Sequence, residues 1–213
     1  INRGPDSLGV LNAVRRTVLA HPDRAVALLG NHEVAFLEWL ADDEGHADGW
    51  LLEDPELLTL RSMLDEAELQ TVISAHVTVE AAGVALKQTL RDRHGELLRW
   101  LQRLPLTYET EHAIYVHAGV DELAGADWRA FTPDHFYTHK FPASTGLFVK
   151  TIVAGHVRAG TLRNSQTDHR AFFDGASHWY IDGSVETTGC LNLLLYNAVT
   201  GEFSSQVVST SGD

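Results

Sequence analysis

Cysteine is almost absent from this sequence, because Cys190 is the only one among 213 residues. A single cysteine excludes an internal disulfide and any cysteine-rich zinc site. It suits a reducing compartment, and we expect a cytoplasmic protein. Apolar runs of membrane-spanning length are also lacking, and the opening residues Ile1-Asn2-Arg3-Gly4-Pro5 are not those of a signal peptide.

Cationic side chains are scarce as well. The chain has 16 Lys and Arg against 29 Asp and Glu, which gives a formal net charge of −13. A field of that sign repels phosphate backbones and anionic lipids, so we expect neither nucleic acid nor a membrane as a partner. Any phosphate-bearing ligand therefore has to meet a local cationic group.

What remains is the composition of an ordinary globular protein, with 44% hydrophobic and 21% charged residues. Surface scaling predicts that roughly 70% of the extended-chain surface is buried on folding, so a core needs no disulfide or structural metal. We expect one domain over residues 1–213, of the α/β class, with a helical insertion at residues 42–104.

Local patterns place the expected elements. A helix from Pro5 to Leu19 is followed by a short buried strand at 24–29 and a helix at 33–40. The acidic stretch that follows predicts helices at 55–64, 66–75 and 80–104. Strands are expected at 112–116, 151–154 and 179–181, with a hairpin that joins 190–196 to 203–208. Residues 121–146 are too irregular to assign.

Histidines follow three of these apolar runs, in the sequences Gly30-Asn31-His32-Glu33, His117-Ala118-Gly119 and Gly155-His156. Ligands of open α/β sheets bind outside the carboxyl ends of the strands, so parallel neighbouring strands would aim these side chains at one place. The alternative is three independent histidines with local hydrogen bonds, which is credible because the chain has 12 histidines.

Side chains of this kind can hold metal ions. Imidazole nitrogens of His117 and His156, with the amide oxygen of Asn31, form half of a mixed donor site suited to Mn, Fe or Zn. Arg3 stands just before the first predicted helix, where free N–H groups attract anions and a guanidinium can bind two phosphate oxygens.

The order of these motifs carries a resemblance. Asn2-Arg3-Gly4-Pro5-Asp6-Ser7, the GNHE, HAG and GH motifs, and the closing Ile181-Asp182-Gly183-Ser184 and Gly189-Cys190-Leu191-Asn192 resemble calcineurin-like metallophosphoesterases. The type is the bacterial serine/threonine phosphoprotein phosphatase. The resemblance implies a four-layer sandwich, in which two mixed β-sheets pack together between outer helices.

The resemblance also implies roles for single residues. Asn31 and His117 match ligands of one metal, and His156 matches a ligand of a second. His32 matches the acid that protonates the leaving oxygen, with Asn2 to orient it, and Arg3 matches a phosphate clamp. The implied cofactors are two divalent ions, Mn in the first place with Fe or Zn as alternatives.

Three family features are missing. The first motif, an Asp-x-His at the end of the first strand, is absent together with the metal-bridging Asp, so we expect this sequence to be a fragment or an incompletely recorded chain. A second phosphate-binding Arg is also absent from its usual place, and Arg129, His139 and Lys140 are candidates to replace it.

The expected function is metal-dependent hydrolysis of a phosphomonoester such as phosphoserine or phosphothreonine. A dinucleoside polyphosphate hydrolase, acting for instance on diadenosine tetraphosphate, is the first alternative, and tryptophans that line the cleft for base stacking would favour it. A metal-poor, inactive domain that binds phosphorylated partners is the second. The expected ligands are thus phosphorylated small molecules, nucleotides or phosphoproteins.

Overall fold

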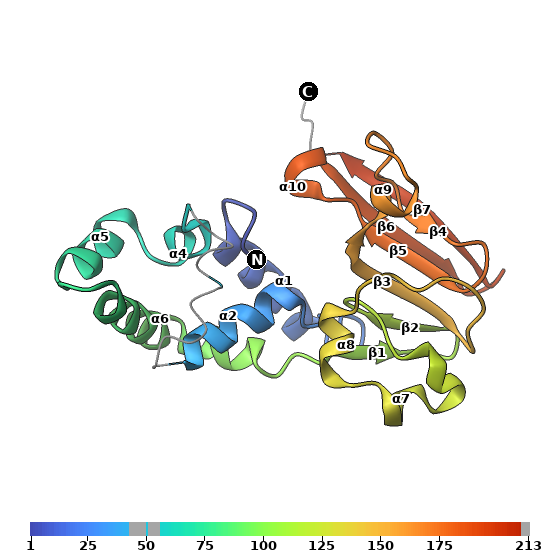
Figure 1. Cartoon of the computed structure of the whole chain (residues 1–213), viewed down its shortest axis with the longest axis horizontal. Coiled ribbons are helices and arrows are strands. Elements are labelled where there is room, and N and C mark those ends of the chain that lie inside the picture. Colours follow the sequence, from blue (N-terminus) through green and yellow to red (C-terminus); the bar gives the residue numbers. More distant parts are fainter. Residues whose placement is uncertain (43–49, 51–55, 210–213) are drawn as a thin grey trace. The chain divides into compact units, whose positions relative to one another are not determined.

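The computed structural model describes residues 1–42, 50 and 56–209. These residues form two compact units, Ile1–Pro105 and Leu106–Asp213, of which the first is helical and the second carries the sheets (Figure 1). The predicted helical segment 42–104 lies within the first unit and shares its core with the helices that precede it. Among the described residues, no helix combines the length and the apolar character needed to cross a membrane.

Three helices of the first unit begin at a side chain that caps them. The described helices of this unit are α1 (Ser7–Ala20), α2 (Asn31–Ala41), α4 (Leu58–Met63), α5 (Glu66–Ser74) and α6 (Val79–Leu101). Asp6, Asp65 and Thr78 accept hydrogen bonds from backbone N–H groups at the starts of α1, α5 and α6. The prediction that Pro5 lies in the first helical turn is wrong, because Asp6 is the N-cap and Pro5 precedes it. Pro55, the predicted start of another helix, lies outside the described residues.

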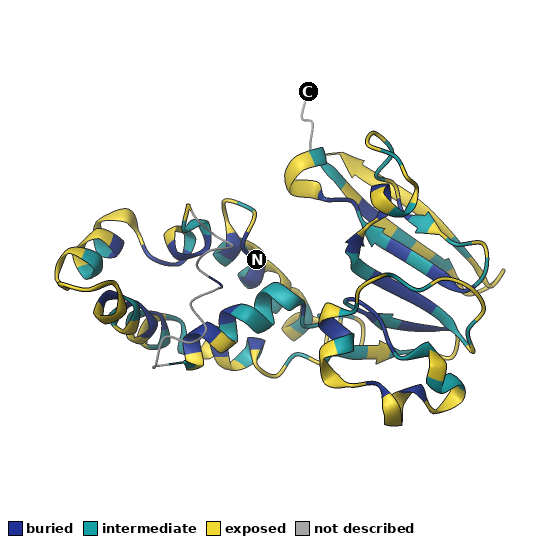
Figure 2. Cartoon of the chain, viewed as in Figure 1, coloured by how far each residue is buried: buried dark blue, intermediate teal, exposed yellow. Residues whose placement is uncertain are grey.

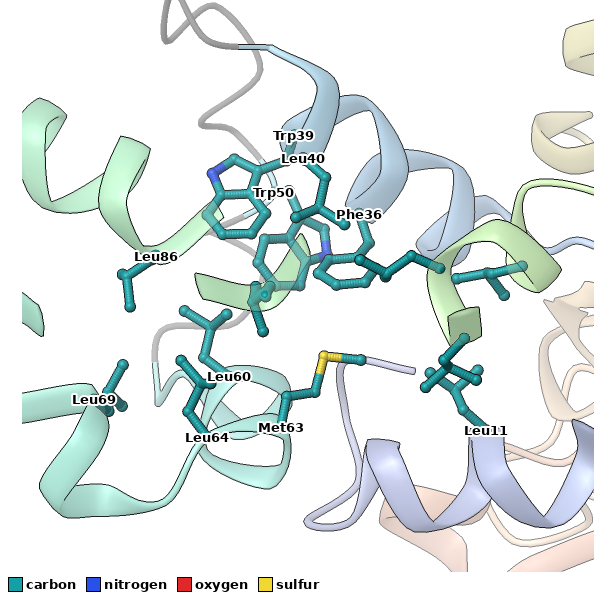
Figure 3. Packing of buried hydrophobic residues seen from close by; sticks show 14 residues of the cluster. Leu11, Phe36, Trp39, Leu40, Trp50, Leu60, Met63, Leu64, Leu69 and Leu86 are labelled. Atoms are coloured by element: carbon teal, nitrogen blue, oxygen red, sulfur yellow. The ribbon is translucent and has the colours of Figure 1, made fainter. Parts of the chain in front are cut away.

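Aromatic residues from α2 and Trp50 form the centre of the first core. The rings of Trp39 and Trp50 lie 4.8 Å apart, and Phe36 lies 5.0 Å from Trp50. Both tryptophans are almost completely buried, and they lie together in this core (Figure 3). Figure 2 shows the buried residues of both units in dark blue. Leucines of the later helices complete this core, among them Leu60, Leu69, Leu90 and Leu101.

The buried strand predicted at 24–29 is wrong. Residues 25–30 belong to no strand or helix, and Val26 is 46% exposed. Leu29 does donate a backbone hydrogen bond to the carbonyl of Pro105, at 3.0 Å. An apolar run becomes a strand only when a neighbouring strand pairs with it along its length, and no such neighbour is present among the described residues.

The second unit is built on a mixed five-stranded sheet in the order β1-β2-β3-β5-β4. Its strands are β1 (Thr107–Glu109), β2 (Ala113–Val116), β3 (Thr151–Arg158), β4 (Phe172–Phe173) and β5 (His178–Asp182). The central strands β2, β3 and β5 are parallel, and the edge strands are antiparallel to their neighbours. The three predicted strands are confirmed, and the short edges β1 and β4 were not predicted.

The predicted hairpin is also confirmed, as β6 (Cys190–Asn197) and β7 (Glu202–Ser209). It packs on one face of the five-stranded sheet, where the rings of Trp179 and Phe203 lie 6.4 Å apart and those of His112 and Tyr196 4.9 Å apart. The α/β prediction is therefore confirmed, with the difference that the second sheet, as far as it is described, is antiparallel rather than mixed.

The opposite face of the large sheet is covered by the segment that could not be assigned from sequence. It contains η1 (Glu122–Asp127), α7 (Trp128–Phe131) and α8 (Asp134–His139). Trp128 and Tyr137 from these helices join Ile114, Ile152 and Tyr180 of the sheet in one buried cluster. Two further short helices, α9 (Ala159–Leu162) and α10 (Val185–Thr188), follow β3 and β5 in the chain.

Candidate functional site

His117 and His156 lie side by side in the second unit. His117 directly follows β2, His156 lies in β3, and their ring centroids are 5.3 Å apart. The two strands are parallel neighbours, so their carboxyl ends meet at the same edge of the sheet. The carbonyl of His117 also accepts a hydrogen bond from the backbone N–H of Gly155, at 2.8 Å. The sequence prediction that these two histidines converge agrees with this geometry.

The backbone of His156 is strained. Its φ of 62° lies in the left-handed region, which residues other than glycine rarely adopt. Pairing of β3 with β5 shifts register between Ala154 and Arg158, so His156 sits in an irregular part of the strand. Strained backbone of this kind clusters at functional sites, where it aims a side chain.

A third imidazole lies close to this pair. The ring of His139, at the end of α8, is 6.5 Å from that of His156, and its Nδ1 lies 2.7 Å from the hydroxyl of Thr138. The other two candidates for the missing phosphate-binding Arg are engaged elsewhere. Arg129 pairs with Glu109 and lies over the ring of Trp128, and Lys140 pairs with Glu122.

Donor chemistry at the histidine pair fits a transition-metal ion in part. Neutral imidazole nitrogens bind Mn, Fe and Zn, so His117 and His156 are suitable ligands. Within the described ranges, however, no three His, Cys, Asp or Glu side chains are grouped so as to hold a metal ion. Further donors are therefore required, and Asn31 is the predicted one.

Asn31 and His32 lie in the first turn of α2. This helix begins at Asn31, two residues before the start that the sequence predicted. The carboxylate of Glu33 accepts a hydrogen bond from the backbone N–H of Gly30, at 3.1 Å. This bond fixes the turn that presents Asn31 and His32. The Glu of the GNHE motif thus has a structural role, which the spacing of a glutamate three residues after a helix N-cap could have revealed.

Asn2 contacts His32. The side chain of Asn2 is buried, and its Nδ2 lies 3.3 Å from Nδ1 of His32. In this orientation the amide donates and the imidazole accepts, which leaves Nε2 as the protonated nitrogen of the neutral ring. Oδ1 of Asn2 is buried and has no hydrogen-bond partner among the described residues, so a half-turn of the amide would let this carbonyl accept from the ring instead.

The start of α1, beside Arg3, differs from the predicted anion site. Arg3 is exposed, and at the start of α1 the carboxylate of Asp6 accepts a hydrogen bond from the backbone N–H of Gly9, at 2.8 Å. Gly9 leaves the room for this cap, since a Cβ there would meet Asp6 Oδ2 at 2.0 Å. A negative cap occupies the place predicted for phosphate, so the guanidinium of Arg3 and not the helix end is the candidate anion-binding group.

The predicted site residues thus fall into two groups. Asn2, Arg3, Asn31 and His32 belong to the first unit, whereas His117 and His156 belong to the second. Asn2 meets His32 and His117 meets His156, and convergence of Asn31 on the histidine pair stays a prediction.

Comparisons with known proteins add no relative. No family model matches the chain, and no curated protein or solved structure matches it significantly. The resemblance to metallophosphoesterases therefore rests on the motifs alone.

Proposed function

We propose that this chain belongs to a metal-dependent phosphoric ester hydrolase that acts on phosphomonoesters, with phosphoserine or phosphothreonine as the substrate class. The observation that carries the proposal is the His117 and His156 pair, 5.3 Å apart after parallel β2 and within β3, with strained backbone at His156. That edge of an α/β sheet is where ligands bind, and paired imidazoles there are suitable donors for a metal centre.

Each residue has a proposed task. Asn31, His117 and His156 would hold two divalent ions, with Mn preferred, and these ions would supply Lewis acidity and lower the pKa of bound water. His32 would give the Nε2 proton to the leaving oxygen as an imidazolium, and its Nδ1–H would then be donated to Oδ1 of Asn2 after the half-turn of the amide. Arg3 binds phosphoryl oxygens with its paired N–H groups and brings local positive charge to an acidic protein.

For the dinucleoside polyphosphate alternative, two of the five tryptophans give no support. It was favoured if tryptophans lined the cleft to stack on bases. Trp39 and Trp50 instead pack against each other in the first core, where they are almost completely buried (Figure 3). Neither ring can reach a nucleotide without disrupting that core.

The test is hydrolysis of a phosphoserine peptide by the natural full-length protein after removal of metal and titration with Mn, Fe or Zn. We expect activity that depends on added metal, and loss of both activity and bound metal in His117→Ala, because one imidazole ligand is removed. His135→Ala, an exposed histidine of α8, is the matched control and should behave as the wild type.

Two results would contradict the proposal. Undiminished activity of His117→Ala at matched metal would remove His117 from the site. Tight binding of the phosphopeptide with no hydrolysis under any metal would favour the inactive phospho-binding domain instead.

A further inference from the structure

A cluster of charged side chains contacts the segment 118–122, which follows His117. It consists of Glu122, Lys140, Asp174 and His178, which come from η1, the end of α8, the turn after β4, and β5. The side chains of Asp174 and His178 are both 2% exposed. No task in the proposed reaction uses any of these residues.

Both ring nitrogens of His178 face carboxylates. Nδ1 lies 3.0 Å from Oδ2 of Asp174, and Nε2 lies 3.6 Å from Oε1 of Glu122. The second separation is an ion-pair distance, longer than a hydrogen bond, and Nε2 has no hydrogen-bond partner in the described part of the chain. An imidazole between two carboxylates favours the form in which both nitrogens carry protons. One N–H then donates a hydrogen bond to Asp174, and the positive ring attracts the carboxylate of Glu122.

Glu122 is held from two further sides. Its Oε2 pairs with Nζ of Lys140 and accepts from the hydroxyl of Ser144 at 3.0 Å. Nζ of Lys140 also donates to the carbonyl of Val120, at 2.5 Å. Lys140 and His178 thus bind both ends of the short segment from Val120 to Glu122.

This segment is the direct continuation of His117. Ala118 N–H donates to the carbonyl of Tyr137 at 2.8 Å, which ties the segment to α8. The aliphatic stem of Lys140 lies against Gly119, where a Cβ would meet its Cδ at 2.6 Å. The His-Ala-Gly motif therefore contacts the lysine that anchors Glu122, and only four residues of chain, 118–121, separate Glu122 from His117.

Charge balance makes the cluster sensitive to pH. With His178 protonated, two cations face two carboxylates, and Tyr180, stacked on the imidazole at 6.3 Å, adds no charge at neutral pH. Loss of the His178 proton leaves a net negative charge in a buried place, which is costly. Burial alone would lower the pKa of His178, but the carboxylates of Glu122 and Asp174 raise it above its ordinary value.

The glutamate behaves in the complementary way. Burial would raise the pKa of Glu122, but His178 and Lys140 lower it to about 2. A histidine whose pKa is higher in the folded than in the unfolded protein contributes its full stabilisation below about pH 6.5. That stabilisation is lost as the pH rises through the pKa of the folded protein. A glutamate whose pKa is lower in the folded than in the unfolded protein contributes its full stabilisation above about pH 4.3. For Glu122 that stabilisation is lost only as the pH falls to about 2. The cluster is therefore complete in mildly acidic solution and weakens on the alkaline side.

We propose that His178 is a positioning residue for His117, which it fixes by holding Glu122 and with it the segment 118–122 while its ring carries two protons. The consequence for catalysis rests on the proposed phosphatase function, whereas the hold on the segment does not. His178 touches no substrate in this proposal and acts only through Glu122.

The experiment measures the segment directly by hydrogen exchange of the full chain, with protection factors for residues 118–123 at pH 6 and pH 9. We expect protection in the wild type to fall by about tenfold or more, the change that corresponds to one unit of pKa difference. In His178→Gln the protection should be low and independent of pH. His135→Gln, exposed on α8, is the control and should follow the wild type.

Glu122→Gln provides a second measurement if His178→Gln does not fold. Removal of one carboxylate should lower the pKa of His178, followed by NMR of its ring protons. Protection of 118–123 that is the same at both pH values in the wild type, or that changes equally in His178→Gln, would overturn the proposal. So would an unchanged His178 titration in Glu122→Gln.

Activity separates this proposal from the proposed function. In an active enzyme, the ratio of wild-type to His178→Gln kcat/KM should exceed one at pH 6 and approach one at pH 9. Absence of hydrolysis by the wild type refutes the phosphatase function, and the exchange and titration results still decide whether His178 holds the segment. An active enzyme whose ratio does not change with pH would refute the positioning of His117.

Discussion

The side-chain amide of Asn2 touches the imidazole of His32, at 3.3 Å between Nδ2 and Nδ1. The contact joins the first motif of the chain to the GNHE motif, and it involves a residue with φ of 91°, a conformation that asparagine and aspartate tolerate better than most. It links the pKa of His32 to the chemistry of the side chain at position 2.

Asn2→Asp should raise the pKa of His32 by about one unit, because a carboxylate in contact with the ring stabilises the imidazolium. NMR titration of the His32 ring protons measures this shift without any assay of activity. Asn2→Ala is the control, since it removes the contact without adding charge. A His32 pKa that is the same in Asn2→Asp and Asn2→Ala would show that residue 2 does not act on the ring.

His32→Ala should lower kcat by about 10²- to 10⁴-fold on a phosphoserine peptide, the usual range for loss of a general acid. On an activated aryl phosphate the loss should be much smaller, because that leaving group departs without a proton. The two substrates are compared with wild type and variant at matched metal content. An equal loss on both would mean that His32 acts through structure or metal binding.

Substitution of His156 should separate its backbone strain from its side chain. At φ of 62° we expect His156→Gly to be more stable than His156→Ala by about 1 kcal/mol, because only glycine adopts this region without cost. At His135, in helix α8, the opposite order is expected. His135→Ala should be more stable than His135→Gly by up to about 1 kcal/mol. Urea unfolding measures both pairs, and alanine and glycine of equal stability at position 156 would contradict the strain.

Asp6→Ala should destabilise the first unit by about 1 kcal/mol, because the N-cap bond to Gly9 is lost. Asp6→Asn should retain most of the stability, since an amide oxygen caps as well as a carboxylate. Urea unfolding followed by helical circular dichroism measures the difference. If both variants lose the same stability, the charge of Asp6 and not its cap would be the stabilising feature.

An element that depends on local signals agrees with the sequence prediction, whereas two segments that depend on pairing with distant residues do not. Helix α5 was predicted at 66–75 and observed at Glu66–Ser74, because its N-cap Asp65 and its apolar spacing are local signals. The run at 24–29 has the local signals of a strand and is not one, because a strand also needs a partner that its own sequence does not contain. The short edge β4 was not predicted for the converse reason, since Phe172 and Phe173 are a strand only through their pairing with β5.

The candidate site divides in the same way. The sequence by itself determined which residues are candidates to carry chemistry, because histidine, asparagine and arginine after apolar runs are readable as types and spacing. It also determined the acidic character and the absence of disulfides. Only the tertiary structure decided that His117 meets His156 and that Asp6 occupies the helix end offered to phosphate. It alone decided that His178, a histidine with no sequence signal, lies between Asp174 and Glu122. The physical reason is that a side chain's donors and charge belong to its residue type, whereas its neighbours depend on strand order, register and burial, which distant parts of the chain determine together.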